Sequence, residues 1–193
     1  MEVKMSWNYY CYGQIKDKEN NWKEFSTQPF SDNLKYYIDF DDVPDVFQRI
    51  RFNDTCKDMI APHFLEEFKD EEFCHYEGYF VQLDDFNKYY YAKIKSISDK
   101  ITTIMNCMGL ETDGADILDS DSIWNIYELN EKTIKHKTIP ICKSAILDLV
   151  KMISELDKYQ YLVSMSKVFE TMAYTEDNTD WKNEKKSFLI VML

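Results

Sequence analysis

The most chemically suggestive part of the sequence is a run of carboxylates between Asp113 and Asp121. Ca²⁺ and Mg²⁺ prefer several such oxygen ligands around a flexible turn. The spacing differs from that of the EF-hand loop, which places acids at its first, third and fifth positions and a glutamate at its twelfth. A small metal-assisted hydrolase or a nucleotide-processing enzyme using this loop is therefore one hypothesis. The run is also an ordinary solvated acidic loop, and we expect no bound metal and no other cofactor.

The other candidate metal ligands, in this case for zinc, are Cys56, His63, Cys74 and His75. Their spacings are unlike the short ligand pairs of common zinc sites. Cys74 and His75 are not expected to work together as nucleophile and base, because adjacent side chains diverge by about 100° on a helix and about 180° on a strand. The four glycines are too scattered for a phosphate-binding loop. We expect no catalytic residues.

The composition limits the class of protein more than any motif does. The 193 residues include 35 acidic and 23 basic side chains, with a formal net charge of −12, and 45% of them are hydrophobic. Such a chain can bury a core, whereas its negative field repels nucleic acid and anionic lipid. The five cysteines lack paired spacing, which favours a reducing compartment. We expect a protein of the bacterial host cytoplasm whose partner is a basic protein surface, not nucleic acid or a membrane.

Much of the negative charge is concentrated in two segments. Residues 63–85 hold eight carboxylates and one lysine, and residues 111–131 hold seven carboxylates and no basic residue. A helix expected between them would be about 36 Å long, so clusters at its two ends could imitate the phosphates of a duplex. Exposed tyrosines of an N-terminal strand would add interface contacts. The candidate partner-binding residues are Glu66, Glu67, Asp70, Glu71, Glu72, Asp113, Asp116, Asp119, Asp121, Tyr10 and Tyr12.

Hydrophobic periodicity predicts several strands. Alternation over residues 3–15 predicts a strand, and residues 22–25 are its expected hairpin partner. Residues 78–83 and 188–193 are further strand candidates, the second of them buried. Residues 123–139 allow either strands or a helix, and their β-branched content favours strands. An acidic, proline-containing link is expected from Asp39 to Asp45.

The clearest predicted helix covers residues 85–108. Its apolar residues recur at steps of three and four, which is typical of an amphipathic helix with one buried stripe. Residues 46–73 are expected to be helical in pieces, with a break before Pro62. After Pro140, helical spacing continues to Met172, as one long helix or as a tight pair.

These elements predict an α+β fold in a single domain of residues 1–193. We expect a mostly antiparallel sheet with an N-terminal hairpin, packed against two or three long amphipathic helices. In composition alone the chain resembles small acidic phage inhibitors and bacterial toxin-immunity proteins, and no motif carries this resemblance. Abundant lysine, asparagine, isoleucine and tyrosine are typical of an AT-rich genome, such as that of a low-GC bacterium or its phage.

The expected function is that of a non-enzymatic inhibitor from the conflict between a bacterium and its phage. Its target would be a basic protein that handles nucleic acid, as for an anti-CRISPR or another anti-defence protein. A toxin-immunity protein, the metal-assisted enzyme described above, and a virion or assembly subunit are the alternatives.

Overall fold

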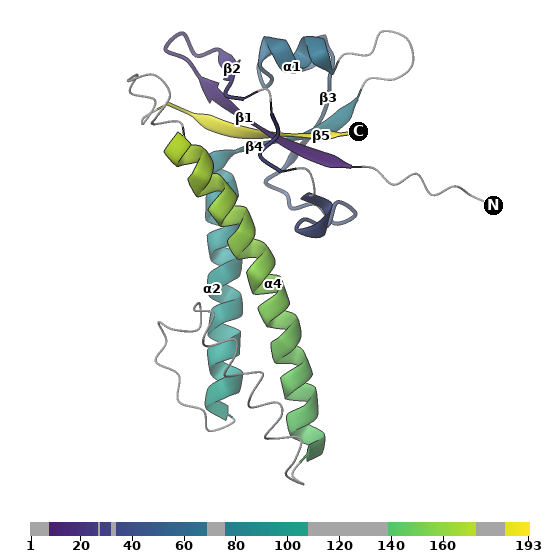
Figure 1. The fold of residues 1–193 in the computed structure, drawn as a ribbon, viewed down its shortest axis with the longest axis vertical. Coiled ribbons are helices and arrows are strands. Elements are labelled where there is room, and N and C mark those ends of the chain that lie inside the picture. Colours follow the sequence, from purple (N-terminus) through teal and green to yellow (C-terminus); the bar gives the residue numbers. More distant parts are fainter. Residues whose placement is uncertain (1–7, 27, 32–33, 69–75, 108–138, 173–183) are drawn as a thin grey trace, which may run out of the picture. The chain divides into compact units, whose positions relative to one another are not determined.

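In the computed structural model, the chain contains a five-stranded antiparallel sheet with helices on both faces (Figure 1). The structure describes residues 8–26, 28–31, 34–68, 76–107, 139–172 and 184–193. The expected α+β class is confirmed. The chain forms two compact units, residues 1–90 with 161–193 and residues 91–160. The division falls inside two long helices, where the sequence has no linker that would mark it.

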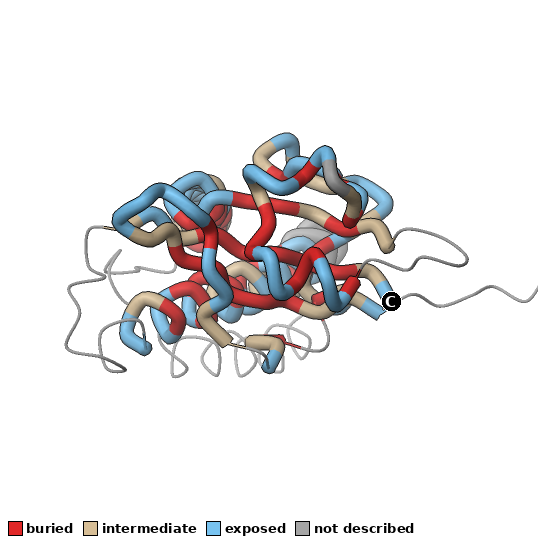
Figure 2. Tube along the Cα trace, turned by 90° about the horizontal axis from the view of Figure 1, so that it is seen from above, coloured by how far each residue is buried: buried red, intermediate tan, exposed pale blue. Residues whose placement is uncertain are grey.

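The sheet is built around the C-terminal strand. The strands are β1 (Tyr9–Lys16), β2 (Trp22–Glu24), β3 (Gln48–Arg51), β4 (Glu77–Gln82) and β5 (Lys186–Met192). Their order across the sheet is β2-β1-β5-β4-β3. β5 is buried from Ser187 to Val191, and Figure 2 shows the buried segments of the chain flanked by exposed ones. Because both of its faces are covered, β5 has a nearly continuous apolar sequence, as the sequence analysis expected.

The expected hairpin of β1 and β2 is also present. Lys16 lies opposite Trp22 in the antiparallel pair. The turn holds Asn20 at a φ of 67°, a left-handed conformation that asparagine tolerates better than most residues. A carboxylate oxygen of Asp17 accepts a hydrogen bond from the backbone N–H of Asn21 at 2.9 Å. This turn chemistry fixes the register of the hairpin.

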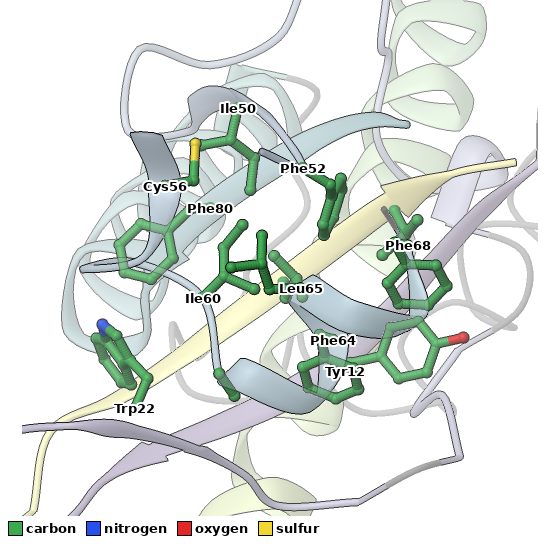
Figure 3. Close-up of a cluster of buried hydrophobic side chains, with 13 residues drawn as sticks. Tyr12, Trp22, Ile50, Phe52, Cys56, Ile60, Phe64, Leu65, Phe68 and Phe80 are labelled. Carbon is green, nitrogen blue, oxygen red and sulfur yellow. The ribbon is translucent and has the colours of Figure 1, made fainter. Parts of the chain in front are cut away.

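One face of the sheet is covered by α1 (Pro62–Glu67). Pro62 lies in the first turn, where a missing N–H removes no intrahelical hydrogen bond. Phe64 and Phe68 pack against the ring of Tyr12, with ring centroids 5.0 and 5.6 Å apart (Figure 3). The buried cluster on this face consists of Tyr12, Trp22, Ile50, Phe52, Cys56, Ile60, Ala61, Phe64, Leu65, Phe68, Phe80, Leu189 and Val191.

Aromatic rings from both long helices cover the opposite face of the sheet. Among the described residues, the remaining helices are η1 (Leu34–Tyr36), η2 (Asp54–Cys56), α2 (Leu83–Cys107) and α4 (Ile139–Met172). Phe86 of α2 and Phe169 of α4 contact Phe188 of β5, at centroid distances of 5.1 and 5.4 Å. Gly13 of β1 lies beneath Phe169, and a Cβ atom at Gly13 would be 2.9 Å from that ring. The missing side chain therefore lets α4 approach the sheet.

Where the structure describes the unit of residues 91–160, it consists of the second part of α2 and the first part of α4. Ile97 and Ile101 of α2 share one buried cluster with Leu149 and Leu156 of α4. The two isoleucines belong to the stripe expected from helical spacing, so the predicted helix is confirmed. The region after Pro140 forms one continuous helix, which decides between the two possibilities that the sequence allowed.

One expected helical stretch is wrong. Residues 48–51 form strand β3, and only Ile50 of these four is buried. β3 pairs with β4, whose residues lie more than 25 positions later, and a propensity estimate from neighbouring residues cannot include such a partner. The helical pieces found in this region, within the described residues, are the short η2 and α1. The expected strands at residues 3–7 and 123–138 lie outside the described residues.

A buried glutamine joins the segment before α1 to the sheet. The side chain of Gln14, on β1, is fully buried. Its Oε1 accepts a hydrogen bond from the N–H of Ala61 at 2.5 Å, while Nε2 donates to the carbonyl of Met59 and to Oγ of Ser187, both at 3.2 Å. The polar atoms of this core glutamine are thereby satisfied. Gln14 thus fixes the start of α1 relative to β1 and β5.

Replacing Gln14 with leucine would leave the N–H of Ala61 and the carbonyl of Met59 without this partner. We expect Gln14→Leu to lower the free energy of unfolding by about 2–3 kcal/mol, measured by urea denaturation. Ser187→Ala is the matched control, because it removes one of the three hydrogen bonds and should cost less than about 1 kcal/mol. An unchanged unfolding midpoint in Gln14→Leu would contradict this role.

Candidate functional site

The structure places four of the residues that the sequence suggested for partner binding. Glu66 and Glu67 are exposed on α1. Tyr10 is half-buried, and Tyr12 is only 6% exposed, with its ring in the core beneath α1. Alternation along β1 does not separate exposed from buried rings, because both faces of the sheet are covered. We therefore leave Tyr12 out of any binding surface.

The remaining suggested residues lie outside the part of the chain that the structure describes. They are Asp70, Glu71, Glu72, Asp113, Asp116, Asp119 and Asp121. The Asp113–Asp121 run proposed for metal-assisted chemistry lies in the same undescribed part, as does the second acidic cluster of the expected duplex-like charge pattern, whereas Glu66 and Glu67 of the first cluster are described. Among the described residues, no group of three or more His, Cys, Asp or Glu side chains is placed to hold a metal ion.

The two described residues of the zinc hypothesis are in different environments. Cys56 is buried in the apolar cluster beneath α1. His63 is half-exposed on α1, where its Nε2 lies 3.4 Å from a carboxylate oxygen of Glu24 and 3.3 Å from one of Glu67. Cys74 and His75 lie outside the described residues. His63 therefore links α1 to β2 through carboxylates, and not through a shared site with Cys56.

A concentrated acidic surface is found where the sequence analysis expected only a link. We call residues 36–45 the acidic loop. Its four aspartates, Asp39, Asp41, Asp42 and Asp45, are all exposed, and the side chain of Tyr36 is 61% exposed. The loop contains no lysine, arginine or histidine. The outward side of the loop is therefore carboxylate with one exposed phenol ring.

Inward-facing rings hold the acidic loop in place. Tyr37 stacks on Tyr161 of α4, with ring centroids 3.8 Å apart and an interplanar angle of 12°. Phe40 stacks on Tyr9 of β1, with centroids 3.7 Å apart and ring planes 2° apart. Ile38, between them in sequence, is buried. These contacts connect the loop to β1 and to α4, which are distant from it in sequence, and so they restrict the positions of the aspartates.

Hydrogen bonds within the loop support the same conformation. The backbone N–H of Ile38 donates to the carbonyl of Leu34 at 2.8 Å, which continues the turn of η1. The N–H of Asp41 donates to a carboxylate oxygen of Asp39 at 3.0 Å. Aspartate commonly closes a turn in this way. The loop is therefore ordered by its own sequence as well as by its contacts.

Both arginines of the chain lie on β3, the strand that follows the acidic loop in sequence. The guanidinium groups of Arg49 and Arg51 both bind the carboxylate of Glu77 on β4, Arg51 at 2.9 Å. These hydrogen bonds, that from Arg49 above all, hold the pKa of Glu77 below its ordinary value of 4.5. The same contact raises the pKa of Arg49. The two cations of β3 are thus engaged by a carboxylate of the sheet.

Burial and nearby charges shift the pKa of Tyr9, whose ring is stacked on Phe40. Partial burial raises the pKa of Tyr9 above its ordinary value of 10.0. Tyr79 and Asp41 act in the same direction, and Arg49 acts against them. The hydroxyl therefore stays protonated at neutral pH, so the stack adds no charge to the loop.

The chemistry that the acidic loop offers is recognition of cations. Exposed carboxylates and an exposed phenol ring both suit lysine ammonium and arginine guanidinium groups. The chain itself gives an example, because Nζ of Lys35 lies 5.8 Å from the centroid of the Tyr36 ring. The sequence signal for this site was the interleaving of apolar anchors with aspartates between residues 37 and 45, which differs from a simple polar link.

Comparison with protein-family models, curated proteins and solved structures finds no match to this chain. The fold and the site described above are those of an α+β protein with an acidic, aromatic loop fixed beside its sheet. None of the described helices is long and apolar enough to cross a membrane.

The Glu77 contacts predict a pH-dependent contribution to stability. Because the pKa of Glu77 is lowered in the folded protein, this contribution is present at neutral pH and is lost as the pH falls below about 4.5 through the lowered pKa. We expect Glu77→Gln to lower the free energy of unfolding by about 1 kcal/mol at pH 7 and by little at pH 3. Urea denaturation at both pH values measures this difference.

The control for this experiment is Asp58→Asn, which changes an exposed carboxylate of the same unit that forms no ion pair with another described residue. It should have the same small effect at both pH values. If Glu77→Gln and the parent protein lose stability in parallel between pH 7 and pH 3, the two arginines do not stabilise the Glu77 carboxylate.

Proposed function

We propose that the chain is a non-enzymatic interaction protein that binds a basic surface of another protein, with the acidic loop as its principal contact. The observation that carries this proposal is the exposure of four aspartates and Tyr36 on one ordered loop that contains no basic residue. Interfaces are enriched in tyrosine, and complementary charge accelerates encounter and selects partners.

The order of the loop strengthens this proposal. A flexible loop would lose conformational entropy on binding, at about 0.5–1.5 kcal/mol for each immobilised side chain. The stacks of Tyr37 on Tyr161 and of Phe40 on Tyr9 have already restricted the acidic loop in the free protein. Its carboxylates are therefore presented to a partner at low additional cost.

The setting that we propose is inhibition of a nucleic-acid-handling protein in the cytoplasm of a bacterial host. A nucleic-acid groove is basic, and a chain with a net charge of −12 is attracted to it. The amino-acid composition, which is typical of an AT-rich genome, fits a phage of a low-GC bacterium. An anti-CRISPR or another anti-defence protein would be an inhibitor of this kind. A toxin-immunity protein would use the same surface chemistry against a basic toxin.

The proposal is tested by capturing partners from a lysate of a low-GC bacterium at 0.1 M and 1 M salt. We expect one dominant basic protein to be retained at 0.1 M and lost at 1 M, where the screening length falls from about 10 to about 3 Å. The loop variant with Asp39→Asn, Asp41→Asn, Asp42→Asn and Asp45→Asn should capture this partner protein at least about tenfold less well at 0.1 M salt.

A matched variant distinguishes the effect of the acidic loop on partner capture from the effect of total charge. Asp58→Asn, Asp99→Asn, Asp148→Asn and Asp157→Asn together remove the same charge from exposed positions outside the loop. This control should capture the partner nearly as well as the parent protein does. Equal capture by the parent and the loop variant would contradict the proposal, and equal losses in both variants would show that net charge alone governs binding.

A further inference from the structure

The sheet ends at β3, whose outer edge has no neighbouring strand among the described residues. In an antiparallel pair, residues that exchange both backbone hydrogen bonds with their partner alternate with residues that exchange none. The N–H of Phe52, directly after β3, donates to the carbonyl of Tyr76 at 3.0 Å. Because the register continues from this pair, Ile50 bonds to β4, whereas the backbone groups of Arg49 and Arg51 point outward.

These outward backbone groups are open to an additional strand. Within the described chain, no backbone hydrogen bond is found to the N–H or C=O of Arg49 or to the N–H of Arg51. The carbonyl of Arg51 accepts a hydrogen bond from the N–H of Asn53 at 2.8 Å, so the open edge ends there. β3 also contains no proline, which often protects an edge. Three unpaired backbone groups in a row are the template for addition of a strand.

The charged side chains of β3 do not cover this edge. Charged side chains commonly protect an edge strand. Arg49 and Arg51 instead bind the carboxylate of Glu77 on the neighbouring strand β4, so their guanidinium groups are directed towards β4. The backbone of the edge is therefore left accessible. Because two guanidinium groups share one carboxylate, this group of three side chains also keeps an excess of positive charge.

We propose that the edge of β3 binds an extended segment of another protein by strand addition, and that the segment carries an aspartate or glutamate facing Arg49 and Arg51. Main-chain hydrogen bonds to the three open groups hold the segment, and its side chains alternate between the two faces of the sheet. The carboxylate balances the excess positive charge, because opposite charges on directly opposed residues of adjacent strands stabilise the pair. The inference uses no residue of the acidic loop and does not depend on the proposed function.

A second copy of the chain fits this edge less well. Antiparallel pairing of two β3 strands through their outward groups sets arginine opposite arginine, because Arg49 and Arg51 are the residues that carry those groups. Like charges directly opposite each other destabilise a strand pair. Two copies would also bring together two chains that each have a net charge of −12. A segment with one carboxylate at this position meets the first of these penalties with an attraction.

The probe is a fluorescein-labelled synthetic heptapeptide of valine and threonine with a central glutamate. We expect saturable binding by fluorescence anisotropy. NMR-detected hydrogen exchange should show the amide of Arg49 exchanging at least about tenfold more slowly at saturating peptide, because this N–H gains a hydrogen bond, while the amide of Asp58 is unchanged. A peptide with lysine in place of the glutamate should bind at least about fivefold more weakly. Absence of binding, or binding without slower exchange at Arg49, would overturn the inference.

Arg49→Pro and Arg49→Ala are the matched variants of the protein. Proline removes the outward N–H, which the pairing of β3 with β4 does not use, and proline is tolerated at such edge positions. Alanine removes the same guanidinium group but keeps the N–H. We expect Arg49→Pro to bind the peptide at least about tenfold more weakly than Arg49→Ala does. Equal affinities would mean that the backbone of the edge is not used, and the inference would fail.

Methylated peptides test the same hydrogen bonds without altering the protein. The amides of a bound strand point alternately towards β3 and away from it, so methylation of every second amide removes these bonds in one frame and leaves them in the other. We expect one frame to abolish binding and the other to retain it within about threefold. Equal affinities in the two frames would overturn the inference even if Arg49→Pro fails to fold. Sedimentation that shows a dimeric parent protein and a monomeric Arg49→Pro would overturn it in favour of a second copy.

Discussion

Burial of β5 on both faces is the constraint on which the sheet depends. Phe188 meets the rings of Phe86 and Phe169 on one side, while Leu189 and Val191 belong to the cluster beneath α1 on the other. β5 also supplies the pairing partner of both β1 and β4. The last strand of the chain therefore closes a sheet begun by the first, which makes the fold rich in contacts between distant residues.

The position of the acidic loop depends on the same arrangement of strands and helices. β1 presents Tyr9 to Phe40, and α4 presents Tyr161 to Tyr37, so the two elements that pack with β5 also hold the loop. Phe40 and Tyr37 of the loop make these inward contacts. Its aspartates are consequently left on the outer side, where charge is not desolvated and remains available to a cationic partner.

Much of the fold could be predicted from the sequence, because several elements have an uninterrupted period. Ile97 and Ile101 mark the buried stripe of α2, and the apolar run of β5 marks a strand covered on both faces. β3 was missed because its partner is distant in sequence. For the same reason the sequence predicts only a link where the acidic loop lies, since stacking of Phe40 on Tyr9 joins residues that no local pattern connects. Burial of Tyr12 depended on α1 covering the second face of the sheet.

The central claim is that a partner covers the acidic loop and not the carboxylates of α1. Hydroxyl-radical footprinting of the protein, free and bound to its basic partner, measures this through side-chain oxidation. The account predicts that Tyr36, which is 61% exposed in the free protein, becomes protected, while Tyr91 in the other unit is oxidised equally in both states. Unchanged oxidation of Tyr36 together with protection of His63 on α1 would contradict it.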